Sequence, residues 1–127
     1  MVLPALRILG NISQGNENQT NHLLNNHILN LLEKLMDRPS TSIRREACWT
    51  SSNICAGTEV QVHKCIFYPS IFEKLMVMLK SDELSVRDEI LYCFKNICYL
   101  GSPNDVYSLL ERCNFLEALS DVIQLRE

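Results

Sequence analysis

The chain has 127 residues, a length that suits one small domain with a buried hydrophobic core. Apolar residues make up 46% of it and charged residues 21%, as in ordinary globular proteins, and the net charge of −3 argues against a nucleic-acid partner while suiting a basic one. No apolar run approaches the roughly 20 residues of a membrane-spanning helix, and the N-terminus lacks the pattern of a signal peptide, so we expect no membrane partner.

Apolar residues recur at helical spacing along the whole chain, which predicts an all-α protein. Glycine, proline and asparagine residues interrupt this pattern and separate short helices from one another. The expected helices span residues 3–14, 17–25, 27–37, 42–56, 59–66, 69–80, 84–100, 103–113 and 115–125.

Several predicted helix ends carry residue types that favour particular end structures. Ser42 and Ser102 are suited to be N-caps, because a serine hydroxyl accepts a hydrogen bond from a free backbone N–H of the first turn. Asn25-Asn26 and Asn114 sit at the turns between predicted short and medium helices. Asparagine tolerates the left-handed backbone conformation that such turns often require, so we expect it at the Asn25-Asn26 turn and at Asn114.

Three similar segments, at residues 6–12, 48–54 and 91–97, each place an asparagine near the end of an apolar helix. The asparagines Asn11, Asn53 and Asn96 are separated by 42 and 43 residues. A recurrence at this period is typical of stacked helical repeats. Stacking aligns the asparagines in a ladder, and a row of amides that can each donate and accept hydrogen bonds suits the backbone of an extended peptide.

The same period divides the chain into units that contain a short, a medium and a long helix in that order. We expect a partial repeat over 1–15, complete repeats over 16–57 and 58–101, and a partial repeat over 102–127. This series of partial and complete repeats is what we expect of a truncated fragment of a longer solenoid. Apolar surface left open at the two ends predicts self-association through those ends, or else frayed termini.

Two stretches, Leu-Pro-Ala-Leu-Arg-Ile-Leu-Gly-Asn-Ile (3–12) and Arg-Arg-Glu-Ala-Cys-Trp-Thr-Ser-Ser-Asn-Ile-Cys-Ala-Gly (44–57), carry a family resemblance. They resemble the armadillo repeats of importin-α (karyopherin-α), which carries nuclear localisation signals into the nucleus. The most specific element is Trp-x-x-x-Asn, formed by Trp49 and Asn53. The resemblance implies a right-handed armadillo solenoid of stacked three-helix repeats, found in the cytoplasm and the nucleus, whose concave groove binds basic signal peptides.

The resemblance also implies which part of the family this chain matches. Arg7 stands four residues before Asn11, at the tryptophan position, as in repeats of the family's C-terminal half near the minor signal-binding site. The chain would then lack the segment that binds importin-β, a partner of the full-length family members. Arg7 is expected either to stay a solvated or salt-bridged cation or to close one end of the site, and the resemblance implies a salt bridge near the minor site. Arg45 matches a lysine commonly found beside the glutamate of the site.

The spacing of polar and aromatic residues gives the expected groove its chemistry. Glu46, Trp49 and Asn53 follow the spacing i, i+3, i+7, which places them on one helical face. Glu89, Tyr92 and Asn96 repeat it. An asparagine can hold a peptide backbone, an aromatic face attracts a lysine or arginine, and a glutamate binds the charged head. The predicted peptide-binding residues are Arg7, Asn11, Arg45, Glu46, Trp49, Asn53, Glu89, Tyr92 and Asn96.

Other interpretations of these residues stay open at the level of sequence. A single tryptophan at helical spacing is also typical of a core, and an asparagine near a helix end is often a cap. The pairing of two sets 43 residues apart favours the groove. Lys95, beside Asn96, would oppose a basic ligand. We expect Arg44 on a solvated face, and Asp82 as ordinary surface charge.

The remaining reactive residues indicate neither a metal site nor an enzyme. The six cysteines form no Cys-x-x-Cys pair and are expected to be buried reduced thiols; they are Cys48, Cys55, Cys65, Cys93, Cys98 and Cys113. The histidines lack metal-ligand spacing, and no phosphate-binding loop or catalytic triad pattern occurs, so we expect no metal, cofactor or catalysis. The alternative to a peptide-binding import adaptor is an armadillo scaffold with an acidic or apolar partner.

Overall fold

The structure, a computed structural model, describes residues 1–68, 71–112 and 114–125, with the side chain of residue 125 excepted. The helices are α1 (Val2–Ser13), α2 (Glu17–Asn25), α3 (Ile28–Leu35), α4 (Thr41–Ile54), α5 (Glu59–Ile66), α6 (Ile71–Ser81), α7 (Leu84–Leu100), α8 (Pro103–Glu111) and α9 (Phe115–Leu125). The predicted all-α class is confirmed, and the described ranges contain no strand. In the same ranges, no helix is both long and apolar enough to cross a membrane.

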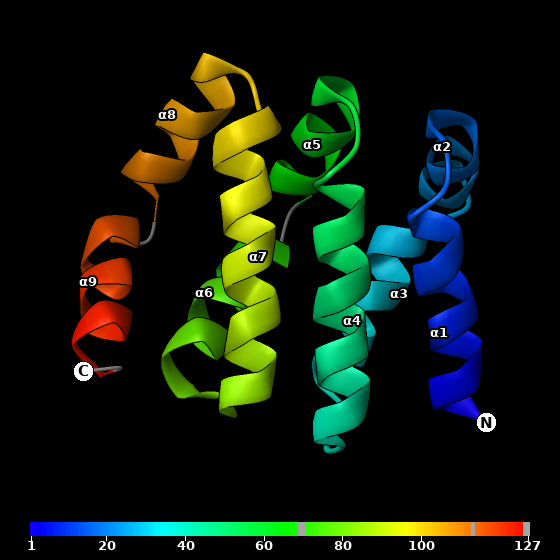
Figure 1. The fold of residues 1–127 in the computed structure, drawn as a ribbon, viewed down its shortest axis with the longest axis horizontal. Helices are drawn as coiled ribbons and strands as arrows, with labels where there is room; N and C mark the ends of the chain where they lie inside the picture. Colours follow the sequence, from blue (N-terminus) through cyan, green and yellow to red (C-terminus); the bar gives the residue numbers. More distant parts are fainter. Residues whose placement is uncertain (69–70, 113, 126–127) are drawn as a thin grey trace.

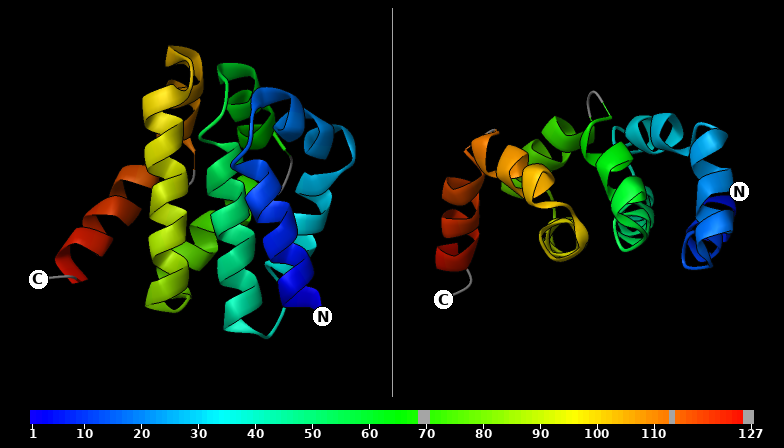
Figure 2. Two further views of the ribbon diagram at one scale, coloured as in Figure 1. Left: turned by 45° about the vertical axis from the view of Figure 1, so that its right-hand side comes forward. Right: turned by 90° about the horizontal axis from the view of Figure 1, so that it is seen from above.

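The helices form two rows with short connecting helices above them (Figure 1). The long helices α1, α4 and α7 stand side by side in one row, and α4 packs against both of the others. The medium helices α3, α6 and α9 form the other row, where α3 packs on α4 and α6 packs on α7. In the view from above, α3 and α6 lie on one side of the row of long helices, and α9 lies at the C-terminal end beyond α7 (Figure 2). Equivalent helices of successive units therefore lie next to each other.

The core lies between the rows and runs along the whole molecule. Two matching sequence blocks, 32–36 on α3 and 72–76 on α6, supply equivalent side chains to it: Leu32 and Phe72 are buried, as are Met36 and Met76. Rings continue the core toward the C-terminus, since the Phe94 ring lies 5.7 Å from Phe72 and 5.2 Å from Phe115 between centroids. Burying each large apolar side chain contributes about 1.5–3 kcal/mol.

Equivalent N-caps start the first helix of each unit. Asn16 and Thr58 each accept a hydrogen bond from the backbone N–H three residues later, and the glutamines there bond back to the cap. Ser102 caps α8, as predicted. The prediction for Ser42 is wrong: Ser40 caps α4, because Ser40 has the extended backbone that a cap needs, whereas residue 42 already lies inside the helix.

The left-handed turn between α2 and α3 falls on His27 (φ 65°), and the prediction for Asn25 and Asn26 is wrong. The side chain of Asn26 donates to the carbonyl of His22 at 2.7 Å and closes the end of α2, so the chain reverses one residue later. Asn114 takes the left-handed conformation (φ 55°) that its type predicts.

The cysteines follow the prediction with one correction. Cys48, Cys55, Cys65 and Cys93 are buried free thiols, but Cys98 is exposed. The Cys55 and Cys93 sulfurs lie 3.5 Å apart between α4 and α7. Burial raises the pKa of the Cys48 thiol well above its ordinary value, so this thiol stays protonated. Cys113 and the helix start predicted at Pro69 lie outside the described residues.

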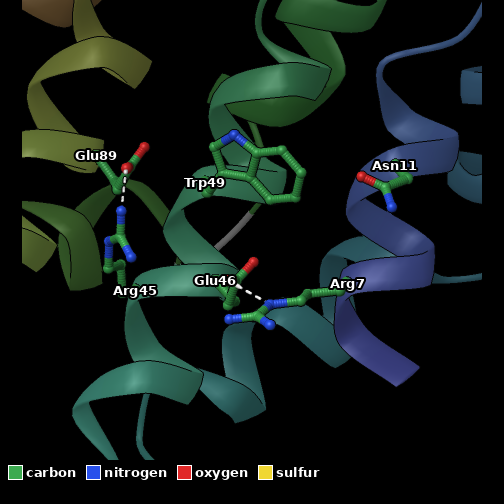
Figure 3. A pocket seen from close by; sticks show the side chains of 6 residues that line it. All are labelled: Arg7, Asn11, Arg45, Glu46, Trp49 and Glu89. Carbon is green, nitrogen blue, oxygen red and sulfur yellow. Dashed lines mark hydrogen bonds and ion pairs between the residues drawn. The ribbon is translucent and has the colours of Figure 1, made fainter. Parts of the chain in front are cut away.

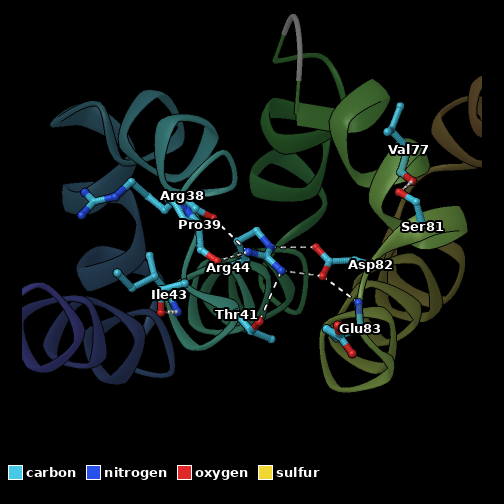
Figure 4. Close-up of polar contacts among 10 residues, drawn as sticks. Arg38, Pro39, Thr41, Ile43, Arg44, Val77, Ser81, Asp82 and Glu83 are labelled. Atoms are coloured by element: carbon cyan, nitrogen blue, oxygen red, sulfur yellow. Dashed lines mark hydrogen bonds and ion pairs between the residues drawn. The ribbon is translucent and has the colours of Figure 1, made fainter.

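Arg44 is not on a solvated face, and Asp82 is not ordinary surface charge. The Arg44 Nε donates to Asp82 Oδ2 and the Nη2 to Oδ1, both at 2.9 Å, which ties α4 to the turn before α7 (Figure 4). The Nη1 donates to the carbonyls of Arg38 and Pro39 at 2.9 and 2.8 Å. Burial alone would raise the pKa of Asp82, but hydrogen bonds from Arg44 and from the Glu83 N–H outweigh burial and lower it. The sequence did not reveal this contact because its partners lie 38 residues apart.

The connecting helices are joined by equivalent polar contacts. Gln61 of α5 is buried, and its Nε2 donates to Glu17 O at 3.1 Å and Asn21 Oδ1 at 2.9 Å on α2. In the next unit Asp105 of α8 replaces the glutamine, and its Oδ1 lies 2.8 Å from the Nδ1 of His63 on α5. The equivalent contact therefore joins two side-chain amides between α2 and α5, and a carboxylate and an imidazole between α5 and α8.

Candidate functional site

The nine predicted binding residues line two adjoining pockets on one face of α1, α4 and α7. The first pocket, of about 190 Å³, is lined by Arg7, Asn11, Arg45, Glu46, Trp49 and Glu89 (Figure 3). The second, of about 340 Å³, lies between α4 and α7 and is lined by Trp49, Ser52, Asn53, Glu89, Tyr92 and Asn96. The two pockets share Trp49 and Glu89, so they form one groove across the three long helices. We refer to these two pockets together as the groove.

Two ion pairs flank the indole of Trp49 (Figure 3). Arg7 Nε donates to Glu46 Oε1 at 3.0 Å, and Arg45 Nη2 lies 3.7 Å from Glu89 Oε1. Each arginine therefore reaches a glutamate on the following long helix. The arginine side chains are 59% and 52% exposed, whereas the glutamates are 12% and 15% exposed. The glutamates are thus fixed in the groove, and the arginines extend from its rim.

Glu89 is a carboxylate of the groove whose pKa is raised above its ordinary value. Burial raises the pKa of Glu89, and Glu46 and Asp88 raise it further, against the opposing effect of Arg45. A raised pKa means that the ionised carboxylate is held in an unfavourable environment. A cation entering the pocket beside Glu89 would relieve it.

The asparagine ladder exists, but it serves the fold as well as the groove. Asn53 Nδ2 donates to the carbonyl of Gly10 at 3.2 Å, and Asn96 Nδ2 donates to the carbonyl of Ser52 at 3.0 Å. The two acceptors are the residues that precede the ladder asparagines of the neighbouring helices, so the two bonds are equivalent. One amide hydrogen therefore joins adjacent helices, and the amide oxygen and the second hydrogen remain for a ligand. Asn11, on α1, is exposed.

Tyr92 extends the aromatic row but already has a cation beside it. Its side chain is 56% exposed, and Lys95 Nζ lies 5.7 Å from the centroid of its ring. A further pocket of about 400 Å³ lies on this side of α7 and is lined by Asp88, Leu91, Tyr92 and Lys95. The groove therefore meets a positive charge at its α7 end.

Comparisons with known proteins agree with this geometry. No family model matches the chain. Over 81 residues it is 36% identical to importin subunit alpha-5 of Arabidopsis thaliana, and over 67 residues it is 39% identical to importin subunit alpha-1a of Oryza sativa subsp. japonica. The matches cover 64% and 52% of this chain, and 15% and 13% of the two relatives. The resemblance to importin-α that the sequence motifs predict is confirmed.

Solved structures match the fold over almost the whole chain. A designed armadillo repeat protein matches with a TM-score of 0.86 at 26% identity, over 98% of this chain and 51% of that chain. The chain is an armadillo-repeat solenoid. A second designed armadillo repeat protein, in complex with the peptide (KR)4, matches with a TM-score of 0.84 at 28% identity, over 94% of this chain and 49% of that chain.

The sequence did not reveal Ser52, which lines the second pocket, or Gly10, which packs against Trp49. Gly10 lies beneath the indole of Trp49, where a Cβ atom would come within 2.2 Å of Trp49 Cζ3. The equivalent positions, immediately before the other ladder asparagines, hold Ser52 and Lys95. The sequence did carry a signal for Gly10, because it is a glycine inside a predicted helix. Glycine lowers helix stability, so its presence there points to a close contact that leaves no room for a side chain.

Proposed function

We propose that this armadillo-repeat protein binds extended lysine- and arginine-rich peptides of the nuclear-localisation-signal type in its groove, as the peptide-binding part of a nuclear import adaptor in the cytoplasm and the nucleus. The observation that carries the proposal is the position of Trp49 between Glu46 and Glu89 in two adjoining pockets. The methylene groups of a ligand lysine or arginine cover the indole face, and its charge reaches a glutamate. A cation held on an aromatic face contributes about 0.5–2 kcal/mol.

The ladder amides supply the second part of the recognition. Asn53 and Asn96 are oriented by their bonds to the neighbouring helix, so a peptide backbone meets amide groups whose rotamers are already fixed. Preorganised groups lose less entropy on binding. Side chains of an extended peptide alternate in direction, so alternate residues enter the pockets beside Trp49 while the intervening ones point away.

The arginines do not block this chemistry. Arg7 and Arg45 are the exposed members of their ion pairs, and a carboxylate has two oxygens that can accept from two cations at once. The arginines hold Glu46 and Glu89 in position, and a ligand cation becomes the second partner of each. Further support comes from the likeness to importin-α subunits and to a designed armadillo protein in complex with (KR)4.

The direct test is a binding titration with a fluorescein-labelled (Lys-Arg)4 peptide followed by anisotropy. The wild-type chain is expected to bind, and raising the salt concentration should weaken binding because exposed charge pairs are screened. Replacing Trp49 by Ala should weaken binding by about 1–2 kcal/mol. Tyr107→Ala is the control, because Tyr107 is a 62%-exposed aromatic on α8, outside the groove. Equal affinity of the Trp49 variant and the wild type would reject the groove.

One observation favours a second candidate function, an armadillo scaffold for a partner that is not a nuclear localisation signal. The pocket beside α1 contains two arginines, Arg7 and Arg45, together with two glutamates, so its own charges cancel. A partner surface with mixed charge would suit that pocket. Binding of an acidic or neutral peptide in place of (Lys-Arg)4, without loss at high salt, would support this second function.

We also propose that the repeats divide at 15/16, 57/58 and 101/102. The N-caps Asn16, Thr58 and Ser102 begin α2, α5 and α8, each the first helix of a unit, so every proposed boundary coincides with an equivalent structural signal. Single-repeat deletion at these boundaries, with retention of a cooperative unfolding transition, is the test.

A further inference from the structure

The residue immediately before each ladder asparagine changes along the groove. It is Gly10 on α1, Ser52 on α4 and Lys95 on α7. Gly10 and Ser52 are buried beneath the next helix, whereas Lys95 is exposed. Ser52 lines the second pocket of the groove together with Tyr92 and Asn96. On α4 this position therefore contributes to the floor of the groove, and on α7 it carries a full positive charge beside the groove.

The lysine also occupies the aromatic face that a third ligand cation would use. Its Nζ lies 5.7 Å from the ring centroid of Tyr92, within the range of a cation–π contact. A lysine or arginine of a peptide could reach that face only by displacing Lys95 and by approaching a like charge. Like charges in contact are unfavourable, so the cation-binding part of the groove ends at the near side of Tyr92.

Lys95 presents an exposed ammonium group where the ladder crosses α7. Asp88 and Lys95 line the same pocket with Tyr92 between them in the sequence, so the pocket has a negative and a positive end. Lys95 is adjacent to Asn96, the ladder residue that meets the peptide backbone. A peptide held by Asn96 therefore passes the positive end of this pocket.

We infer that Lys95 determines specificity by pairing with an acidic side chain of the bound peptide. The preferred ligand then has cationic residues in the two pockets beside Trp49 and a glutamate or aspartate where the peptide crosses α7. This inference rests on the proposed function of the groove and adds to it: a ligand with charge of both signs, in a fixed order, is preferred over a uniformly basic one.

The test uses one basic core peptide, labelled with fluorescein, that carries Lys, Ala or Glu at a single flanking position. The flank is placed at the N-terminal side in one series and at the C-terminal side in the other, so that either peptide direction is covered. Dissociation constants are measured at low salt for the wild type, Lys95→Ser, Lys95→Glu and the control Lys64→Ser. Lys64 is an exposed lysine on α5, outside the groove, and Ser is the residue that α4 carries at the equivalent position.

In one of the two series, the wild type is expected to bind the Glu-flanked peptide about threefold more tightly than the Lys-flanked one, the effect of about one exposed ion pair. Lys95→Ser should remove the preference while the Ala-flanked peptide still binds, Lys95→Glu should reverse it, and Lys64→Ser should leave it unchanged.

Failure of the role of Lys95 and failure of the proposed function give different results. If the wild type binds the core peptide but ignores the flanking charge in both series, or if Lys95→Glu keeps the wild-type ranking, the role of Lys95 is wrong and the groove stands. If none of the peptides binds the wild type, the proposed function is wrong and the role of Lys95 falls with it.

Discussion

The indole of Trp49 occupies the space in which a side chain at Gly10 would lie. A Cβ atom there would come within 2.2 Å of Cζ3 and within 2.8 Å of Cε3 of the ring. The missing side chain on α1 therefore decides where the aromatic face of the groove lies, although the two residues are 39 positions apart in the chain.

Replacing Gly10 by Ala is expected to destabilise the protein by about 1–3 kcal/mol, because the ring must leave its place or the helices must separate. Urea unfolding gives the stability, and the emission of Trp49, the only tryptophan, reports the ring environment. The same change in a Trp49→Ala background should be neutral or stabilising, since alanine favours a helix more than glycine does. An equal loss in both backgrounds would show that the ring is not the cause.

Replacing Asn53 by Ala should affect both stability and binding. The variant loses the hydrogen bond to the Gly10 carbonyl, so the free energy of unfolding should fall by about 1 kcal/mol, and peptide affinity should fall with it. Asn11 is the matched comparison, because it is an exposed ladder residue. Asn11→Ala should leave the urea midpoint unchanged, and a drop equal to that of Asn53→Ala would contradict the structural role of the ladder bond.

The pair formed by Arg44 and Asp82 should make stability depend on pH in the acid range. The pKa of Asp82 is lowered in the folded chain, so the unfolded chain binds the proton more readily. The stabilisation is fully present above the ordinary value of 3.8 and is lost as the pH falls through the lowered folded value. Asp82→Asn should flatten this dependence and cost about 1–3 kcal/mol at neutral pH, because Arg44 loses a charged partner. Asp121→Asn, an exposed change on α9, serves as the control in urea unfolding at several pH values.

Peptide binding should depend on pH through Glu89. Its pKa is raised in the folded chain above the ordinary 4.5, and a bound cation favours the ionised form. Affinity for a basic peptide should therefore fall as the pH is lowered through the raised value, at a pH above 4.5. Without ligand, the contribution of Glu89 to the stability of the folded chain should instead improve as the pH falls through this value, because protonating Glu89 relieves the cost of burying its charge. Glu89→Gln should weaken binding and remove this pH dependence, whereas Glu59→Gln, on an exposed part of α5, should preserve it.

The outermost helices should mediate self-association. Ile8 on α1 and Ile123 on α9 are 61% and 66% exposed, so both helices present apolar side chains to solvent. Sedimentation velocity over a range of concentrations should show association, and the double change Ile8→Glu and Ile123→Glu should reduce it. If the protein is a monomer at every concentration, self-association is rejected. The terminal helices are then expected to fray, and amide hydrogen exchange measures this.

The sequence by itself determined the helices and most of the residues that line the groove. Helix periodicity and helix breakers are local properties, so the predicted spans agree with the structure to within a few residues. The recurrence of the asparagines at 42 and 43 residues was sufficient to place Trp49 and Asn53 on the same face as Tyr92 and Asn96, because stacking repeats the same local geometry.

Only the tertiary structure decided how the long helices hold one another. The amide hydrogen that Asn53 gives to Gly10, the space that Gly10 leaves for Trp49 and the bonds between Arg44 and Asp82 all join residues about 40 positions apart. Such contacts depend on the distance and angle between stacked helices, which no single helix encodes. The turn at His27 escaped prediction for a local reason: the Asn26 side chain bonds to the carbonyl of His22, so the left-handed residue comes one position later than the asparagines.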